Sequence, residues 1–256
     1  MRSESNSLMS GGLALLADGS PSVNNFVTIV SRISPAGHPD VLLLQARYQP
    51  ALYNDDLFQD FQLPFPSRLN KAVAKRRAEY LASRVCVRFE LNQFGIKNFI
   101  LANDADRAPI WPQEIVGSLS HSRTCVSLLL AKASARKLLG VDVEEIMRPE
   151  TAEEMRDMIV SPREAKLLLS SGLPFASALT AAFSLKESLY KALFPPFRQF
   201  MNFSEAEIIA CDATMSSVTL RLTRALSPAF PVGRLFTGHV QLEENRLITW
   251  IVAPQA

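Results

Sequence analysis

Two short segments of the chain carry carboxylates and lysines at spacings that could hold a phosphate and a metal ion. The first reads Gly-Val-Asp-Val-Glu-Glu from residue 140, with Asp142 and Glu144 two positions apart in an apolar, β-branched run. Because side chains alternate along a strand, both carboxylates would point to one face and the two valines to the other, into a core. This segment therefore predicts a strand that ends in two oxygen donors.

The second segment, Phe183 to Lys191, has the spacing of an amphipathic helix. Glu187 and Lys191 are four residues apart, so they lie on one face of that helix, with Ser184 beside them. The opposite face is apolar, which predicts that it is buried while the Glu187 face looks into a cleft. The apolar positions are Ala182, Leu185, Leu189, Ala192 and Leu193. We expect this helix to end at Pro195–Pro196.

Each motif alone is common, since an exposed Glu/Lys pair on a helix is usually a surface salt bridge worth about 0.3 to 0.5 kcal/mol. Together they offer three carboxylates, Asp142, Glu144 and Glu187, beside lysines. Magnesium prefers hard oxygen ligands and is usually held by one or two carboxylates plus substrate phosphates. We therefore predict a Mg²⁺ site with these three carboxylates as ligands and Lys186 and Lys191 as phosphate contacts. We expect Asp142 and Glu187 to lie on exposed faces of the site and to pack against nothing.

These residues resemble the signature of the 4'-phosphopantetheinyl transferases, Val/Ile-Gly-Val/Ile-Asp-x-Glu followed by Phe/Trp-Ser/Cys/Thr-x-Lys-Glu-Ala/Ser-x-x-Lys. Every position of the second motif is filled, and in the first only Leu139 replaces the usual Val or Ile. The resemblance is closest to the enterobactin synthase component D type of this family. It extends through Arg107 to Pro112, Gly117 to Ser122 and Leu173 to Thr180, and so covers most of residues 70 to 200.

The resemblance implies an enzyme that moves the phosphopantetheine arm of coenzyme A onto a serine of an acyl, aryl or peptidyl carrier protein. The reaction would use Mg²⁺ and release 3',5'-ADP, and siderophore or nonribosomal peptide biosynthesis is the favoured setting. Arg76 and Arg84 match family positions that bind the 3'-phosphate and adenosine end, Arg107 matches a nucleotide contact, and Ser120 and His121 match phosphate contacts. The expected coenzyme A contacts are therefore Arg76, Arg84, Arg107, Ser120, His121, Asp142, Lys186 and Lys191.

The expected catalytic residues are Glu187 and Lys191. Glu187 is the best candidate for the general base, because it would lie near the metal on an open helix face. A carboxylate bound to magnesium is a weak base, however, so a metal-bound water deprotonated with help from Glu187 or Glu144 would serve as well. Both routes stay open at this point.

Arginines interrupt the apolar face of a long helix expected from Pro66 to Leu91. Arg77, Arg84 and Arg88 form one stripe within that face, although arginine seldom points inward unless it is paired or keeps its charged end in water. One interpretation places the stems at the rim of the core. The other places the stripe against an anionic ligand such as coenzyme A, whose phosphates match the guanidinium geometry.

The order of expected helices and strands around these residues indicates an α+β fold with antiparallel sheets. The resemblance adds two similar halves in a pseudo-two-fold arrangement, with the active site in the cleft between them. We expect a loosely ordered segment at 1–25, an N-terminal half at 26–136 with the nucleotide contacts, and a C-terminal half at 137–256 with the metal and catalytic motifs. Expected strands are 26–33, 41–48, 98–101, 124–131, 137–144, 204–211, 217–222, 234–242 and 247–252, and expected helices are 66–91, 151–158, 161–170 and 176–193. Gly117 is expected in an exposed turn.

The composition fits a soluble enzyme, with 256 residues, 48% apolar residues, 20% charged residues and a formal net charge of +2. No apolar run is long enough to cross a membrane, and the first residues lack the basic region of an export signal, so we expect a cytoplasmic protein. The three cysteines and three histidines are scattered without metal-ligand spacing, so a zinc site is not expected.

Two other classes of protein fit the sequence less well than the transferase. A nucleic-acid-binding protein would need a strong basic excess, which a net charge of +2 does not give. A non-catalytic module that binds a carrier protein or a nucleotide could keep the arginines but would not need the three carboxylates. Two internal halves also favour a monomer, and the identity of the carrier stays open.

Overall fold

Our computed structural model describes residues 25–255. The expected loose segment at 1–25 lies outside this range except for its last residue. The fold is α+β with antiparallel sheets, as predicted. Within the described residues no helix is both long enough and apolar enough to cross a bilayer.

The first sheet has four antiparallel strands in the order β1-β2-β6-β5. The long helix α2 (Ala74–Gln93) packs against it, and an apolar core fills the space between them. The strands are β1 (Val27–Ile33), β2 (Val41–Tyr48), β5 (Ile115–His121) and β6 (Cys125–Lys132). A short helix, α1 (Leu57–Asp60), precedes α2 in the chain. A two-stranded ribbon, β3 (Ala102–Asn103) with β4 (Pro109–Ile110), follows α2.

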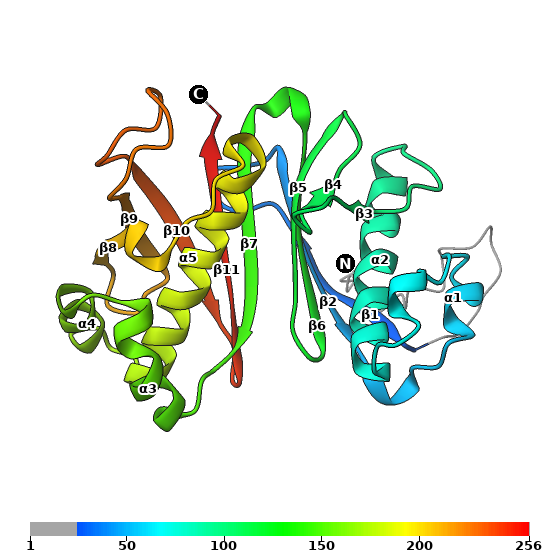
Figure 1. Cartoon of the computed structure of the whole chain (residues 1–256), viewed down its shortest axis with the longest axis horizontal. Helices are drawn as coiled ribbons and strands as arrows, with labels where there is room; N and C mark the ends of the chain where they lie inside the picture. Colours follow the sequence, from blue (N-terminus) through cyan, green and yellow to red (C-terminus); the bar gives the residue numbers. More distant parts are fainter. Residues whose placement is uncertain (1–24, 256) are drawn as a thin grey trace, which may run out of the picture.

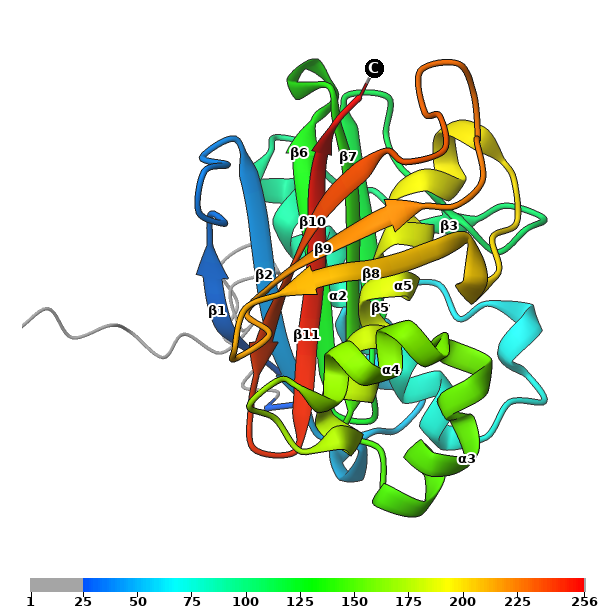
Figure 2. The same cartoon turned by 90° about the vertical axis from the view of Figure 1, so that its left-hand side faces the viewer.

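The second sheet has five antiparallel strands in the order β7-β11-β10-β9-β8. Its long helix is α5 (Phe175–Phe197), and α3 (Pro149–Ile159) and α4 (Pro162–Leu169) pack beside α5, as Figure 2 shows. The strands are β7 (Lys137–Glu145), β8 (Ala206–Cys211), β9 (Ser217–Leu222), β10 (Leu235–Leu242) and β11 (Arg246–Pro254).

The strands β7 and β5, where the two sheets meet, lie between the two long helices (Figure 1). A third apolar cluster joins the sheets, and it includes Leu43 and Leu129 of the first and Val141 and Ile248 of the second. The edge strands β5 and β7 run beside each other, where the Val141 amide donates a hydrogen bond to Ser118 Oγ at 3.0 Å. Both carboxylate motifs therefore lie at the junction of the two sheets.

Close contact between α5 and β7 depends on Gly140. A Cβ atom at this position would lie 1.8 Å from the carbonyl oxygen of Ser188. Real Cβ atoms do not approach a backbone oxygen so closely, so any larger residue would push the helix away from the strand. The glycine of the first motif thus fixes the distance between the two elements that carry the carboxylates.

Several expected boundaries are wrong. Helix α5 does not end at Pro195–Pro196 but continues to Phe197. The fixed φ of proline is compatible with a helix, so both prolines remain in the last turn, although neither can donate a backbone hydrogen bond. Helix α2 begins at Ala74 and not at Pro66, since a separate 3₁₀ turn and an extended Val73 precede it.

The strand β5 was not expected, and Gly117 belongs to it and not to an exposed turn. Two of its buried positions are Ser118 and Ser120, which hide the apolar alternation that marks a strand. The short strand expected at 98–101 is replaced by β3 at Ala102–Asn103.

Candidate functional site

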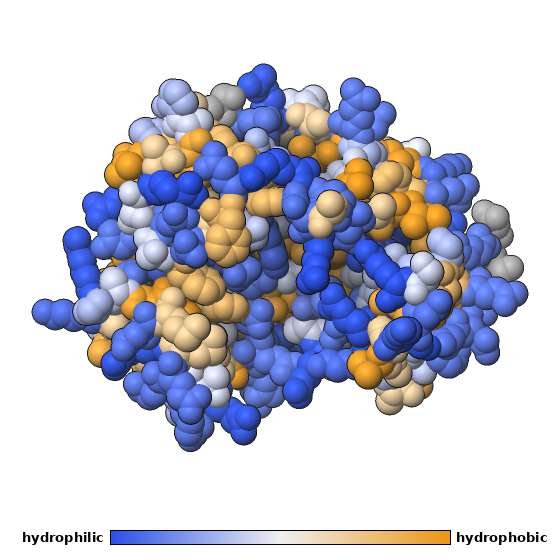
Figure 3. Space-filling model, viewed as in Figure 1, coloured by the Kyte–Doolittle hydropathy of each residue, from blue (hydrophilic) through white to orange (hydrophobic). Residues whose placement is uncertain are grey.

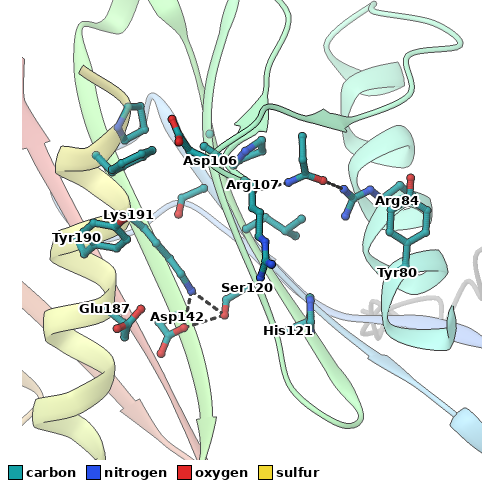
Figure 4. A pocket seen from close by; sticks show the side chains of 18 of the residues that line it. Tyr80, Arg84, Asp106, Arg107, Ser120, His121, Asp142, Glu187, Tyr190 and Lys191 are labelled. Carbon is teal, nitrogen blue, oxygen red and sulfur yellow. Dashed lines mark hydrogen bonds and ion pairs between the residues drawn. The ribbon is translucent and has the colours of Figure 1, made fainter. Parts of the chain in front are cut away.

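A cavity of about 760 Å³ lies between α5 and α2, over the adjacent strands β7 and β5. Figure 3 shows hydrophilic side chains at the centre and on the right of the hollow on this face of the molecule, and more apolar ones on its left. With one exception, Lys186, the expected site residues line it, and Figure 4 shows side chains from both long helices pointing into it. The lining residues expected from the sequence are Arg76, Arg84, Arg107, Ser120, His121, Asp142, Glu144, Glu187 and Lys191.

Asp142 lies at the centre of a buried hydrogen-bond network. It accepts hydrogen bonds from Ser120 Oγ at 2.8 Å, from Ser184 Oγ at 2.7 Å and from Lys191 Nζ at 2.6 Å. Burial acts against ionisation, but Lys191 and the two hydroxyls outweigh it and hold the pKa of Asp142 below its usual value. Asp142 is only 2% exposed, so the expectation that it packs against nothing is wrong.

The other two carboxylates have the opposite tendency. Burial, and then the neighbouring charge of Asp142, raises the pKa of Glu144 to about 7. Burial also raises the pKa of Glu187, which Lys191 partly offsets. Within residues 25–255 the Glu187 carboxylate makes no ion pair and accepts no hydrogen bond. It is therefore a half-buried carboxylate with no hydrogen-bond or ion-pair partner among the described residues.

The donor chemistry of this cluster fits a hard divalent cation. Three carboxylates face one cavity, and two of them have raised pKa values that a nearby positive charge would lower. In the described part of the chain, no three His, Cys, Asp or Glu side chains are grouped so that they could hold a metal ion as they stand. Lys191 now supplies the positive charge beside Asp142. Binding of Mg²⁺ by Asp142, Glu144 and Glu187 thus remains a prediction.

The opposite wall of the cavity is basic. Arg84 is only 7% exposed, and its guanidinium lies 4.2 Å from the centre of the Tyr80 ring. It donates hydrogen bonds to the carbonyl oxygen of Leu101 and to Asn103 Oδ1. A buried guanidinium fixed by stacking and by hydrogen bonds is a rigid donor for an anionic group.

The stripe of arginines on α2 does not act as one surface. Arg77 donates to the carbonyl oxygens of Leu69 and Asn70, at 3.1 and 2.8 Å, and Arg88 donates to that of Gln62 at 2.8 Å. These two arginines hold the loops around α2 in place. Of the stripe, only Arg84 lines the cavity.

His121 follows Ser120 at the end of β5 and lines the same cavity. Burial lowers the pKa of His121, and nearby cations act in the same direction. The imidazole is therefore neutral near pH 7 in the free protein and can offer a hydrogen bond to a phosphate.

Lys186 does not reach the cavity, so its expected role as a phosphate contact is wrong. Its side chain is 2% exposed and lies 2.7 Å from Glu164 Oε1, with further bonds to the carbonyl oxygens of Ile159 and Phe203. Glu164 in turn accepts the Ile208 amide and caps α4. The lysine of the second motif thus joins α5 to α4 and β8 instead of meeting a ligand.

We predict that Lys186→Ala lowers the free energy of unfolding by about 3 to 5 kcal/mol, because it leaves the Glu164 carboxylate buried without its cation. Denaturant unfolding measures this loss. Lys166→Ala, which removes an exposed lysine of α4, is the matched control and should change stability little. A Lys186→Ala protein of normal stability with weakened coenzyme A binding would restore the original interpretation.

Some cavity residues had no signal in the sequence. Arg68 donates to Asn103 Oδ1 at 3.2 Å and lies over Tyr80, yet it is an isolated residue in an expected helix start. Asn103 and Tyr190 also line the cavity. Ser184 was expected beside Glu187, but it is buried and bonds Asp142. Only the tertiary fold shows these contacts.

Comparison with known proteins gives matches to two family profiles. One, described as the 4'-phosphopantetheinyl transferase N-terminal domain, matches residues 65–131, and the other, the 4'-phosphopantetheinyl transferase superfamily, matches residues 138–237.

Three relatives show the range of similarity. Enterobactin synthase component D of Salmonella typhimurium is 36% identical over 191 residues, which cover 75% of this chain and 78% of that protein. The protein of that name from Salmonella typhi is 41% identical over 158 residues, covering 62% of this chain and 65% of that protein, which is less than two thirds of its length. 4'-phosphopantetheinyl transferase Svp of Streptomyces mobaraensis is 32% identical over 187 residues, covering 71% of this chain and 74% of that protein.

Proposed function

Because the chain belongs to the 4'-phosphopantetheinyl transferase superfamily, we propose that it transfers the phosphopantetheine arm of coenzyme A to a serine of a carrier protein. One observation supports this most strongly. A single cavity has arginines from α2 and from the β3–β4 turn on one wall and carboxylates from β7 and α5 on the other. Such a cavity suits a ligand with phosphates at one end and a reacting pyrophosphate at the other.

In the proposed reaction the serine hydroxyl oxygen forms a bond to the β-phosphorus of coenzyme A. The bond from that phosphorus to the bridging oxygen breaks, and 3',5'-ADP leaves with the electron pair. The hydroxyl proton passes to a base in the cavity. Little covalent work falls to the protein, so positioning and charge stabilisation account for the rate.

Asp142, Glu144 and Glu187 would hold the magnesium ion, whose chemical contribution when bound is to neutralise charge on the pyrophosphate. The Asp142 carboxylate is fixed by two serines and Lys191, so it is already oriented. Lys191 Nζ also donates to Ser120 Oγ at 3.1 Å, which places an ammonium beside the carboxylates. We assign Lys191 to a non-bridging phosphate oxygen.

We assign proton removal from the carrier serine to Glu187. It is half-buried and lines the cavity, so it can accept the hydroxyl proton directly or through one water. A magnesium ion held by the same carboxylate would lower its pKa, so proton transfer through a water is the route that fits both of its roles. Arg76, Arg84, Arg107 and His121 would contact the phosphates of the nucleotide end. Guanidinium groups suit that role because they can form two parallel hydrogen bonds to a phosphate.

The physiological acceptor is proposed to be a carrier protein of siderophore or nonribosomal peptide biosynthesis, because relatives of this chain are named enterobactin synthase component D. Incubation of the protein with an apo carrier, coenzyme A and Mg²⁺ tests the proposal. The carrier should gain the mass of one phosphopantetheine arm, and a chelator should stop the gain. A carrier of unchanged mass, across aryl, peptidyl and acyl carriers, would overturn the assignment.

We predict that Lys191→Ala lowers turnover with coenzyme A by about 10- to 100-fold, because it removes the ammonium beside Asp142 and the pyrophosphate. The Asp142 carboxylate also loses its ion pair, so thermal stability is measured alongside steady-state kinetics. Lys191→Arg keeps a cation at this position and should recover part of the rate. Unchanged turnover in Lys191→Ala would show that the lysine has no part in the reaction.

A further inference from the structure

The turn between β3 and β4 lies at the cavity and carries Arg107. Residues Asn103, Asp106, Arg107 and Ala108 all line the cavity, and Figure 4 shows the Arg107 side chain pointing into it. Arg107 has a φ of 68°, in the left-handed region that a non-glycine residue adopts only at some cost. Something must therefore hold this turn in its shape.

One anchor of the turn comes from α2. Asn103 Oδ1 accepts hydrogen bonds from Arg84 and Arg68, and its Nδ2 atom donates to the carbonyl oxygen of Arg107 at 2.6 Å. A single asparagine thus links the backbone of Arg107 to the basic wall of the cavity.

A second anchor comes from the other side, at the end of α5. Arg198 donates a hydrogen bond to Asp104 and lies 3.7 Å from Asp106 Oδ2. The other oxygen of Asp104 accepts the Ala108 amide at 2.9 Å, so one carboxylate both closes the turn and ties it to α5. The hydrogen bond from Arg198 lowers the pKa of Asp104, as expected for a carboxylate that meets a guanidinium.

The end of α5 presents Arg198 in a fixed position. Its φ of 52° ends the helix, and its amide donates to the carbonyl oxygen of Phe194. The guanidinium carbon lies 5.4 Å from the centre of the Phe194 ring. The two prolines before Phe197 have fixed φ angles, which further restricts the last turn. The helix end and the phenylalanine ring thus favour the orientation in which the arginine meets the turn.

We propose that Arg198 is a positioning residue, which clasps the β3–β4 turn to α5 so that Arg107 faces the anionic end of coenzyme A. Arg198 does not line the cavity, so it acts only through the turn. With the Asn103 anchor, the clasp connects α2 to α5 across the cavity. A turn that is already ordered costs less conformational entropy when the ligand binds. This role rests on the proposed function.

The test compares Arg198→Gln with the wild-type protein in coenzyme A binding, turnover and amide hydrogen exchange. We expect the Kd and the KM for coenzyme A to rise about three- to tenfold while kcat changes less than about twofold, because ground-state positioning is lost and the reacting groups stay in place. Exchange in residues 104–108 should become faster. Arg198→Lys should recover part of the affinity. Arg234→Gln is the matched control, because Arg234 also lies over a phenylalanine ring but donates to the carbonyl oxygen of Ala229 and not to the β3–β4 turn.

Asp104→Asn keeps an oxygen for the Ala108 amide but removes the charge that meets Arg198. If the clasp acts as proposed, the Asp104→Asn and Arg198→Gln losses are not additive in the double variant. Additive losses, or unchanged coenzyme A affinity and exchange in Arg198→Gln, would overturn the clasp while leaving transferase activity intact. A wild-type protein that neither binds coenzyme A nor transfers its arm would overturn the proposed function instead, and exchange in 104–108 would still decide whether Arg198 holds the turn.

Discussion

Glu187→Gln should lower the rate of phosphopantetheine transfer by about 10²- to 10⁴-fold, the range expected when a general base is removed. Glutamine has nearly the same shape, and within residues 25–255 the Glu187 carboxylate accepts no hydrogen bond that the change would break. Its neighbours Ser184 and Asp142 bond each other and not Glu187. The variant should therefore keep its melting temperature while it loses kcat.

Stopped assays with the carrier as acceptor measure the rate, and coenzyme A binding is measured separately by calorimetry. Glu153→Gln is the matched control, because Glu153 is an exposed carboxylate of α3 that pairs with Arg156 at 3.6 Å, away from the cavity. Its activity should equal that of the wild type. A Glu187→Gln protein within about threefold of wild-type kcat would remove this residue from the reaction, and a lowered melting temperature would show a structural role.

The difference between Glu187 and its neighbour Lys186 shows what the sequence could predict. Glu187 was correctly placed toward the cleft because the opposite face of its helix is apolar. Lys186 lies one residue earlier, a rotation of about 100° on the helix, which moves it to the side of Ala182 and Leu193. Its burial follows from this geometry. Its partner Glu164 could not be predicted, because only the tertiary fold brings α4 against α5.

Strands were predictable where apolar residues alternate or run together, and so β1, β2, β6 and β7 lie close to their expected ranges. The missed strand β5 is the one whose buried side chains serve the site. Ser118 bonds the β7 backbone and Ser120 bonds Asp142, so polar residues occupy positions that usually show the hydrophobic pattern. A strand edge that carries polar functional residues is therefore missed when strands are predicted from hydrophobic alternation.

The same limit applies to the site residues. The signature motifs identified the carboxylates and Lys191, and the family resemblance identified Arg84, Arg107 and His121, which the structure brings to one cavity. The contacts that orient them come from residues without any motif. Arg198 and Asn103 hold the turn of Arg107 from opposite sides, and this relation depends on how α2 and α5 are placed by the two sheets.

Gly140→Ala should cause a large loss of stability and of activity together. The added methyl group would lie 1.8 Å from the Ser188 carbonyl oxygen and 3.0 Å from the Ala192 side chain. The first contact is with backbone, so a side-chain rotation cannot relieve it, and α5 must move away from β7. Overpacking typically costs about 1 to 3 kcal/mol, and we expect the upper end of this range because the contact is with backbone. Denaturant unfolding at equilibrium measures the cost.

The same displacement should also reduce activity, because Ser184, Glu187 and Lys191 all lie on α5 while Asp142 lies on β7. A misplacement of about 1 Å between reacting groups can cost on the order of 100-fold in rate. Gly238→Ala is the matched control, since Gly238 also lies beneath α5 but its added methyl would meet the tip of the Leu185 side chain at 2.5 Å, which can rotate away. If the two alanine variants lose similar stability and keep similar activity, Gly140 does not set the spacing on which the network around Asp142 depends.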